Sequence, residues 1–121
     1  MNAISYQIQD GQLFVSGKQV AMPSKVTKIL QVGDILVALV DYTGVIRNIF
    51  GVDEAGKILW QIQIQSLLDF GFHRKYFTNI FFSEQGELLA DHADGYDCCI
   101  NPKDGTVEPW LPPGQKSTRP W

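Results

Sequence analysis

The start of the chain alternates apolar and polar residues in short runs. Residues 4–8 read Ile-Ser-Tyr-Gln-Ile, and residues 12–15 form a second run that is mostly apolar. Asp10-Gly11 lies between the two runs. An Asp-Gly pair suits a type I′ turn, because that turn needs a positive φ at both central residues. The pattern therefore predicts a β-hairpin at this point of the chain.

Short runs of this kind continue to residue 110. Residues 35–40 are continuously apolar between Gly33-Asp34 and Asp41, which predicts a strand buried on both faces. The turn at residues 53–56 separates two further runs and predicts another hairpin. The expected strands are residues 4–8, 12–15, 35–40, 45–52, 57–64, 76–82, 87–90, 96–100 and 106–110.

One stretch, residues 66–72, breaks this rhythm and suits a helical turn or two that ends at Gly71. We therefore expect an all-β fold, an antiparallel meander of hairpins with at most one short helix. The strands would form two blade-like sheets or a small sandwich. We expect residues 1–111 to form a single domain and residues 112–121 to form an irregular, proline-rich C-terminal tail.

Composition places the chain among small globular domains. The sequence has 121 residues, 45% of them hydrophobic, and a formal net charge of −3. This acidic balance argues against a nucleic-acid partner, which normally meets a basic face. The longest apolar run is too short to span a membrane, and the first residues show no signal peptide. With only Cys98 and Cys99 present, we expect a cytoplasmic protein without a disulfide framework.

Turn residues recur at a spacing of about fifty residues, which suggests an internal repeat. Gly44, Gly56 and Trp60 correspond in this comparison to Gly95, Gly105 and Trp110. The Asp53 to Trp60 segment resembles the hairpin that ends a blade in the β-propellers of quinoprotein-like and kelch-like proteins. This resemblance covers about half of the chain and implies blade-like sheets, although a propeller needs 4–8 blades. A stand-alone meander, a sandwich of two sheets and an oligomer that completes a ring all remain open.

The densest group of reactive side chains lies in residues 91–99. The stretch contains Asp91, His92, Asp94 and Asp97, followed by the two cysteines. The calcium ligands of an EF-hand and the four ligands of a zinc site are both incomplete here. A Cys-His nucleophile would need an imidazole base close to the thiol. We therefore expect no metal, no cofactor and no catalytic residue, and keep a small enzyme or metal-binding protein using the Asp91–Cys99 hairpin as the alternative.

Aromatic residues suggest two further sites. Residues 70–77 mix aromatic side chains with His73, Arg74 and Lys75, a combination that can stack nucleobases. The acidic total favours instead a loop whose aromatic residues pack into the core. Trp60 and Trp110 are expected core anchors, whereas Trp121 lies in the expected tail and is a candidate anchor for a partner.

These observations favour a non-catalytic protein-binding module. In size, charge and class the chain resembles the immunity proteins that neutralise bacterial toxins, which implies a basic cognate toxin of the nuclease type as the partner. An acidic inhibitor would associate faster with a basic toxin because their charges are complementary. The expected contact residues are the turn carboxylates and the terminal tryptophan: Asp41, Asp53, Glu54, Asp91, Asp94 and Trp121.

Overall fold

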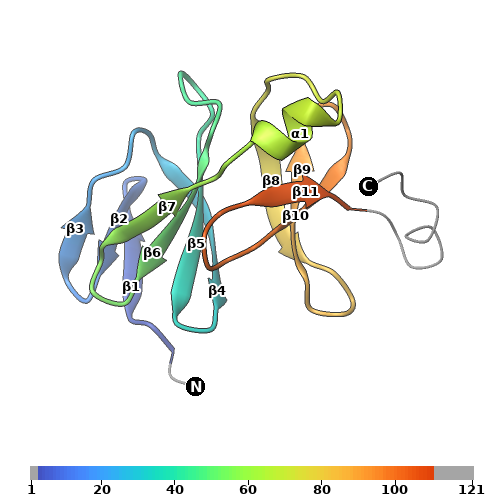
Figure 1. Ribbon diagram of the computed structural model, residues 1–121. Helices are drawn as coiled ribbons and strands as arrows, with labels where there is room; N and C mark the ends of the chain where they lie inside the picture. Colours follow the sequence, from blue (N-terminus) through green and yellow to red (C-terminus); the bar gives the residue numbers. More distant parts are fainter. Residues whose placement is uncertain (1–2, 111–121) are drawn as a thin grey trace.

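The computed structural model describes residues 3–110, and these residues form three antiparallel sheets and one short helix. Each strand of this described region pairs only with strands next to it in the sequence (Figure 1). The first sheet has the order β1-β2-β3. Its strands are β1 (Tyr6–Gln9), β2 (Gln12–Val15) and β3 (Lys18–Val20). The Asp10-Gly11 turn joins β1 to β2 with φ angles of 53° and 79°, as the sequence predicted.

The second and third sheets have four strands each and the same consecutive order. The second consists of β4 (Val26–Val32), β5 (Ile35–Val40), β6 (Ile49–Asp53) and β7 (Ile58–Gln61). The third consists of β8 (Phe77–Phe82), β9 (Leu88–His92), β10 (Asp97–Ile100) and β11 (Val107–Pro109). The helix α1 (Gln65–Asp69) connects these two sheets. It is too short to cross a membrane, and α1 is the one helix in the described part of the chain.

The second sheet stands between the other two and is buried on both faces (Figure 1). Leu36, Ala38 and Val40 pack with the first sheet, whereas Val37 and Leu39 pack with the third. Because successive strand residues point to opposite faces, a continuous apolar run is what such a strand requires. The all-β meander and the doubly buried strand at residues 35–40 are thus confirmed, with three sheets in place of two.

Trp60, in the second sheet, packs against and hydrogen-bonds to the third sheet. Its indole Nε1 donates a hydrogen bond of 2.8 Å to the carbonyl oxygen of Pro102 in the β10–β11 turn. The ring lies against Gly51 and Gly105, and a Cβ atom at either glycine would overlap the indole. Gln63 and Thr106 form an isolated parallel bridge beside this contact. A large aromatic ring between two glycines therefore sets the spacing of the two sheets.

The repeat of about fifty residues is present in the strand order, but the two tryptophans are not equivalent. Trp60 pairs with Gly51 inside the second sheet. The backbone N–H of Trp110 donates to Asp97, and the corresponding bond in the second sheet comes from Ile62, whose N–H donates to Ile49. A bulge in β7 supplies the extra residue that shifts this register. The expected equivalence of Trp60 and Trp110 is therefore wrong.

Candidate functional site

Three loops from the second and third sheets meet at one end of the molecule. They are residues 41–48, 70–76 and 93–96, and we call this surface the loop end (upper side of Figure 1). The rings of Tyr42 and Tyr76 stack with centroids 3.8 Å apart and planes 10° apart. The rings of Phe72 and Tyr96 lie 5.3 Å apart. Aromatic contacts thus join the loops at residues 41–48 and 93–96 to the middle loop, residues 70–76.

Asn48 holds the first loop against the start of β8. Its side chain is 1% exposed. The Nδ2 group donates to the carbonyl oxygens of Val40 and Phe77 at 3.0 and 2.9 Å, and Oδ1 accepts from the Phe77 N–H at 2.9 Å. One buried amide therefore satisfies both backbone groups of Phe77, which would otherwise lose their partners in an apolar region.

Asp94 organises the other two loops. Its carboxylate accepts hydrogen bonds from the backbone N–H of His73 at 3.1 Å and from Lys75 Nζ at 3.0 Å. The Nδ1 atom of His73 lies 3.0 Å from the same carboxylate. The Lys75 hydrogen bond, with help from His73, lowers the pKa of Asp94 to about 2. Asp94 is therefore ionised and already paired inside the protein.

His92 lies beneath this group as a buried, neutral imidazole. Its Nδ1 accepts the N–H of Asp94 at 3.1 Å, so Nε2 carries the proton and donates to the His73 carbonyl oxygen at 3.1 Å. The rings of Phe72 and Phe77 meet the imidazole edge-on at 5.1 and 5.5 Å. Burial lowers the pKa of His92. The imidazole thus positions two loops, and both of its nitrogens are already engaged by the backbone.

A shallow hollow of about 360 Å³ opens beside this network. Its lining residues come from the middle loop and the β9–β10 turn: Phe70, Gly71, Phe72, His73, Asp94 and Tyr96. Three aromatic side chains at the loop end face solvent, with exposed fractions of 40% for Phe70, 49% for Tyr42 and 61% for Tyr96. The loop end therefore combines exposed aromatic surface with a fixed backbone.

The carboxylates named from the sequence do not form one surface. Asp41 and Asp94 lie at the loop end, whereas Asp53 and Glu54 lie in the β6–β7 turn at the lower side of Figure 1. Asp91 lies in β9, opposite Asp97. Trp121 and residues 112–121 lie outside the described residues.

Two of these carboxylates close their own turns. Asp41 accepts from the N–H of Thr43, and hydrogen bonds from the Thr43 side chain and backbone lower the pKa of Asp41. Asp53 accepts from the N–H groups of Ala55 and Lys57. Such Asx-type turns are a structural use of aspartate. Sequence reasoning missed this use, and it also missed Asn48, whose only signal was a polar residue inside an expected apolar strand.

Asp91 and Asp97 face each other across β9 and β10. A hydrogen bond that the protonated Asp97 carboxyl donates to Asp91, together with burial and the like charge of Asp91, raises the pKa of Asp97 to about 6. Two hydrogen-bonded carboxyl groups share one proton more readily than they both ionise. The Asp97 carboxyl is therefore partly protonated in mildly acidic solution.

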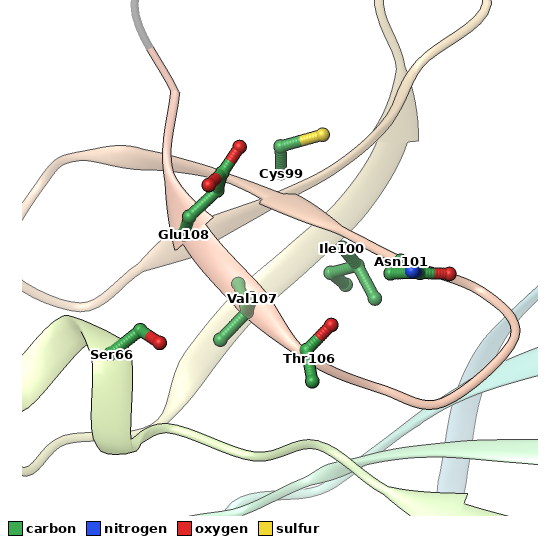
Figure 2. Close-up of a pocket in the computed structure, with 7 residues that line it drawn as sticks. All are labelled: Ser66, Cys99, Ile100, Asn101, Thr106, Val107 and Glu108. Atoms are coloured by element: carbon green, nitrogen blue, oxygen red, sulfur yellow. The ribbon is translucent and has the colours of Figure 1, made fainter. Parts of the chain in front are cut away.

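The two cysteines occupy different environments, because adjacent residues of a strand point to opposite faces. Cys98 is buried, and this burial, with the charges of Asp97 and Asp91, raises the pKa of its thiol to about 12. Cys99 lines a hollow of about 350 Å³ with Ser66 and Glu108, where Cys99 and Glu108 project on the same side of β10 and β11 (Figure 2). No histidine lines this hollow. Within residues 3–110, no three metal-ligating side chains converge. The hairpin alternative gains no support from this geometry.

Comparison with known proteins changes the family assignment. No curated protein matches the chain. Two computationally designed proteins of known structure match: Ika4, with 17% identity and a TM-score of 0.55, and Ika8, with 18% identity and a TM-score of 0.52. The matches cover 88% and 86% of this chain, but only 65% of Ika4 and 31% of Ika8. This chain therefore spans less than two thirds of either design, and the likeness concerns the fold alone.

Both resemblances expected from the sequence are wrong. The propeller resemblance fails because the strands of the described region form three separate sheets and close no ring; the solved structures that match are designed proteins. The resemblance to immunity proteins fails because no such family is among the matches. The family model that matches residues 1–110 is described as "Domain of unknown function (DUF7957)", and the chain belongs to that family.

Proposed function

We propose that the chain is a non-catalytic protein-binding module and that the loop end is its contact surface. The observation that carries this proposal is the gathering of Tyr42, Phe70 and Tyr96, all exposed, on three loops held by buried polar contacts. Aromatic residues, tyrosine above all, are enriched at protein interfaces because they bury a large area with few rotatable bonds.

The rigid backbone of the loops supports the same proposal. Asn48, Asp94 and His92 each join two segments that are distant in the sequence. A surface that is ordered before binding loses less conformational entropy when a partner docks. The exposed rings can therefore contribute more of their contact energy to affinity.

The partner proposed for the loop end is a protein whose contact residues include arginine or lysine. The net charge of −3 of the whole chain favours a basic protein during diffusional encounter, while the three loops themselves carry Arg47, Arg74 and Lys75 against Asp41 and Asp94. Exposed tyrosine rings also accept arginine or lysine side chains through cation–π contacts, each contributing about 0.5–2 kcal/mol. Substitutions that leave the fold intact can show whether the partner binds at the loop end or elsewhere on the molecule.

The test compares two variants for binding to a protein recovered with the full chain from its native host. Replacing Tyr42 and Tyr96 by alanine removes two exposed rings of the loop end. We expect the dissociation constant to rise at least about tenfold, the effect of losing one or two interface anchors. Isothermal titration calorimetry with the purified partner measures this change.

Leu59→Ala is the matched control, because Leu59 is also an exposed apolar side chain, at 44%, but lies in β7 away from the loop end. This variant should bind the partner as the unchanged chain does. If Leu59→Ala weakens binding as much as the double variant, or if the double variant binds normally, the loop end is not the contact surface.

A further inference from the structure

Among the described residues, the first sheet ends in an open strand. It has three strands where the other two sheets have four, and within residues 3–110 β1 pairs only with β2. All four residues of β1 are exposed. An open strand edge presents unpaired backbone N–H and C=O groups that another strand can bind.

The other edge strands of the described region carry features that hinder such pairing. A bulge interrupts three of them, with Thr27, Leu59 and Thr78 as the extra residues in β4, β7 and β8. The strands β3 and β11 have three residues each and contain Lys18 and Pro109 respectively. Bulges, charges, proline and short length are the devices by which proteins protect sheet edges.

β1 has none of these devices apart from its modest length. Its residues are Tyr-Gln-Ile-Gln, without a charge or a proline. It pairs with β2 in an unbroken register from Tyr6–Val15 to Gln9–Gln12. Tyr6 and Ile8 share one face of the strand and are 40% and 41% exposed, while Gln7 and Gln9 lie on the other face.

The hairpin turn determines which backbone groups point outward. A two-residue turn closes on a hydrogen-bonded pair, here Gln9 and Gln12, and bonded pairs then alternate along the strands. Ser5, two pairs further on, accepts the N–H of Ser16 at 2.9 Å, which fits this alternation. The N–H and C=O groups of Tyr6 and Ile8 therefore point toward the open edge.

We propose that β1 is a self-pairing edge, at which two copies of the chain join antiparallel to form a dimer. Because the outward groups belong to Tyr6 and Ile8, the register must place Tyr6 opposite Ile8 of the second copy and Gln7 opposite its own equivalent. Each Tyr6 then lies beside an Ile8 on one face, an aromatic and β-branched pair of the kind that stabilises sheets. Four backbone hydrogen bonds join the two strands.

The pattern of β1 favours a second copy over other occupants because it is complementary to itself. Two uncharged strands meet without repulsion, and the apolar residues of both fall on the same face. The contact is short, so the dimer should be weak and should depend on protein concentration in the micromolar to millimolar range. This interface is separate from the loop end and does not depend on the function proposed above.

Engineered cysteines test the register in the full chain, with Cys99 replaced by serine and the buried Cys98 retained. At a non-hydrogen-bonded position the two Cα atoms lie about 4.5 Å apart, within the range that a disulfide needs. Gln7→Cys should therefore form a covalent dimer under mild oxidation. Gln9→Cys is the matched control: the same residue type on the same face, but about 13 Å from its equivalent by strand geometry.

Equal crosslinking of the two cysteine variants, or none by Gln7→Cys, would overturn the proposal. Sedimentation of the unmodified chain gives a second measurement that needs no engineered thiol. We expect reversible dimerisation, weakened about tenfold or more by Ile8→Lys, which places a charge at the edge. A chain that stays monomeric up to about 1 mM, or a dimer that Ile8→Lys leaves intact, would equally exclude pairing through β1.

Discussion

Asn48 shows how one side chain can hold together segments from two sheets. Its amide satisfies both backbone groups of Phe77 in a region closed to solvent. Asn48→Ala should lower the free energy of unfolding by about 2–4 kcal/mol, because it leaves buried donors and acceptors without partners. Urea denaturation measures this loss.

Asn101→Ala is the comparison variant for this prediction. Asn101 also bonds to the backbone, through its Oδ1 and the N–H of Lys103, but it does so at an exposed turn. Its loss should cost about 0.5 kcal/mol, since water replaces the bond. Similar losses in the two variants would show that burial does not set the importance of Asn48.

Asp97 should make the stability of the protein depend on pH. Its pKa in the folded state, about 6, lies above the usual value of 3.8, so the folded protein binds the proton more tightly than the unfolded chain does. The stabilisation is therefore present below about pH 4 and is lost as the pH rises through 6. Asp97→Asn should raise stability at pH 8 by about 1–2 kcal/mol, because an amide can donate to Asp91 without charge repulsion.

Thermal melts at pH 4 and pH 8 test this expectation for Asp97. The gain from the substitution should be clear at pH 8 and nearly absent at pH 4, where the Asp97 carboxyl of the folded protein is protonated and no longer repels Asp91. A gain that is the same at both pH values would mean that the facing carboxyl groups do not share a proton.

Among the elements, β6 and β7 depend on a close contact between a ring and the backbone. The indole of Trp60 lies where a Cβ atom at Gly51 would be, so Gly51→Ala should cost about 1–3 kcal/mol through overpacking. The same substitution should cost much less when Trp60 is replaced by leucine, because the obstructing ring is gone. A double-mutant cycle from denaturant unfolding gives the coupling energy, and a coupling near zero would contradict this reading.

Elements with a simple pattern could be predicted from the sequence, and interrupted ones could not. The Asp10-Gly11 hairpin, the strand at residues 35–40 and the short helix are confirmed, the last with Gly71 at a φ of 91°. The strand β4 was missed because the bulge at Thr27 interrupts its alternation. The expected strand at residues 45–52 begins only at Ile49, since residues 45–48 belong to the loop that Asn48 anchors.

The candidate site was harder to predict than the strands. The sequence located two of its loops as separate motifs, residues 70–77 and 91–99, and named Asp41 and Asp94. Their convergence depends on how the second and third sheets pack, and no short pattern encodes that packing. The roles of Asp41 and Asp53 depend on local backbone geometry, because each carboxylate accepts N–H groups of its own turn.

At the scale of the whole molecule, the polarity of each sheet face depends on whether the sheet is an inner or an outer layer. The middle sheet is apolar on both faces, whereas the first sheet turns a glutamine-rich face outward, with Gln7, Gln9, Gln12 and Gln19. An outer layer needs only one apolar face to bury, so its other face can remain polar. The loop end and the β1 edge belong to different layers, which allows two contacts at once.

The consecutive strand order also bears on how the chain folds during synthesis. Every hairpin can close as soon as its second strand has left the ribosome, because its partner immediately precedes it in the sequence. The middle sheet, however, covers one face with the first sheet and must wait for β8 to β11 to cover the other. Until then, Val37, Leu39 and Trp60 face solvent on the nascent chain, and this interval is when chaperones would be needed most.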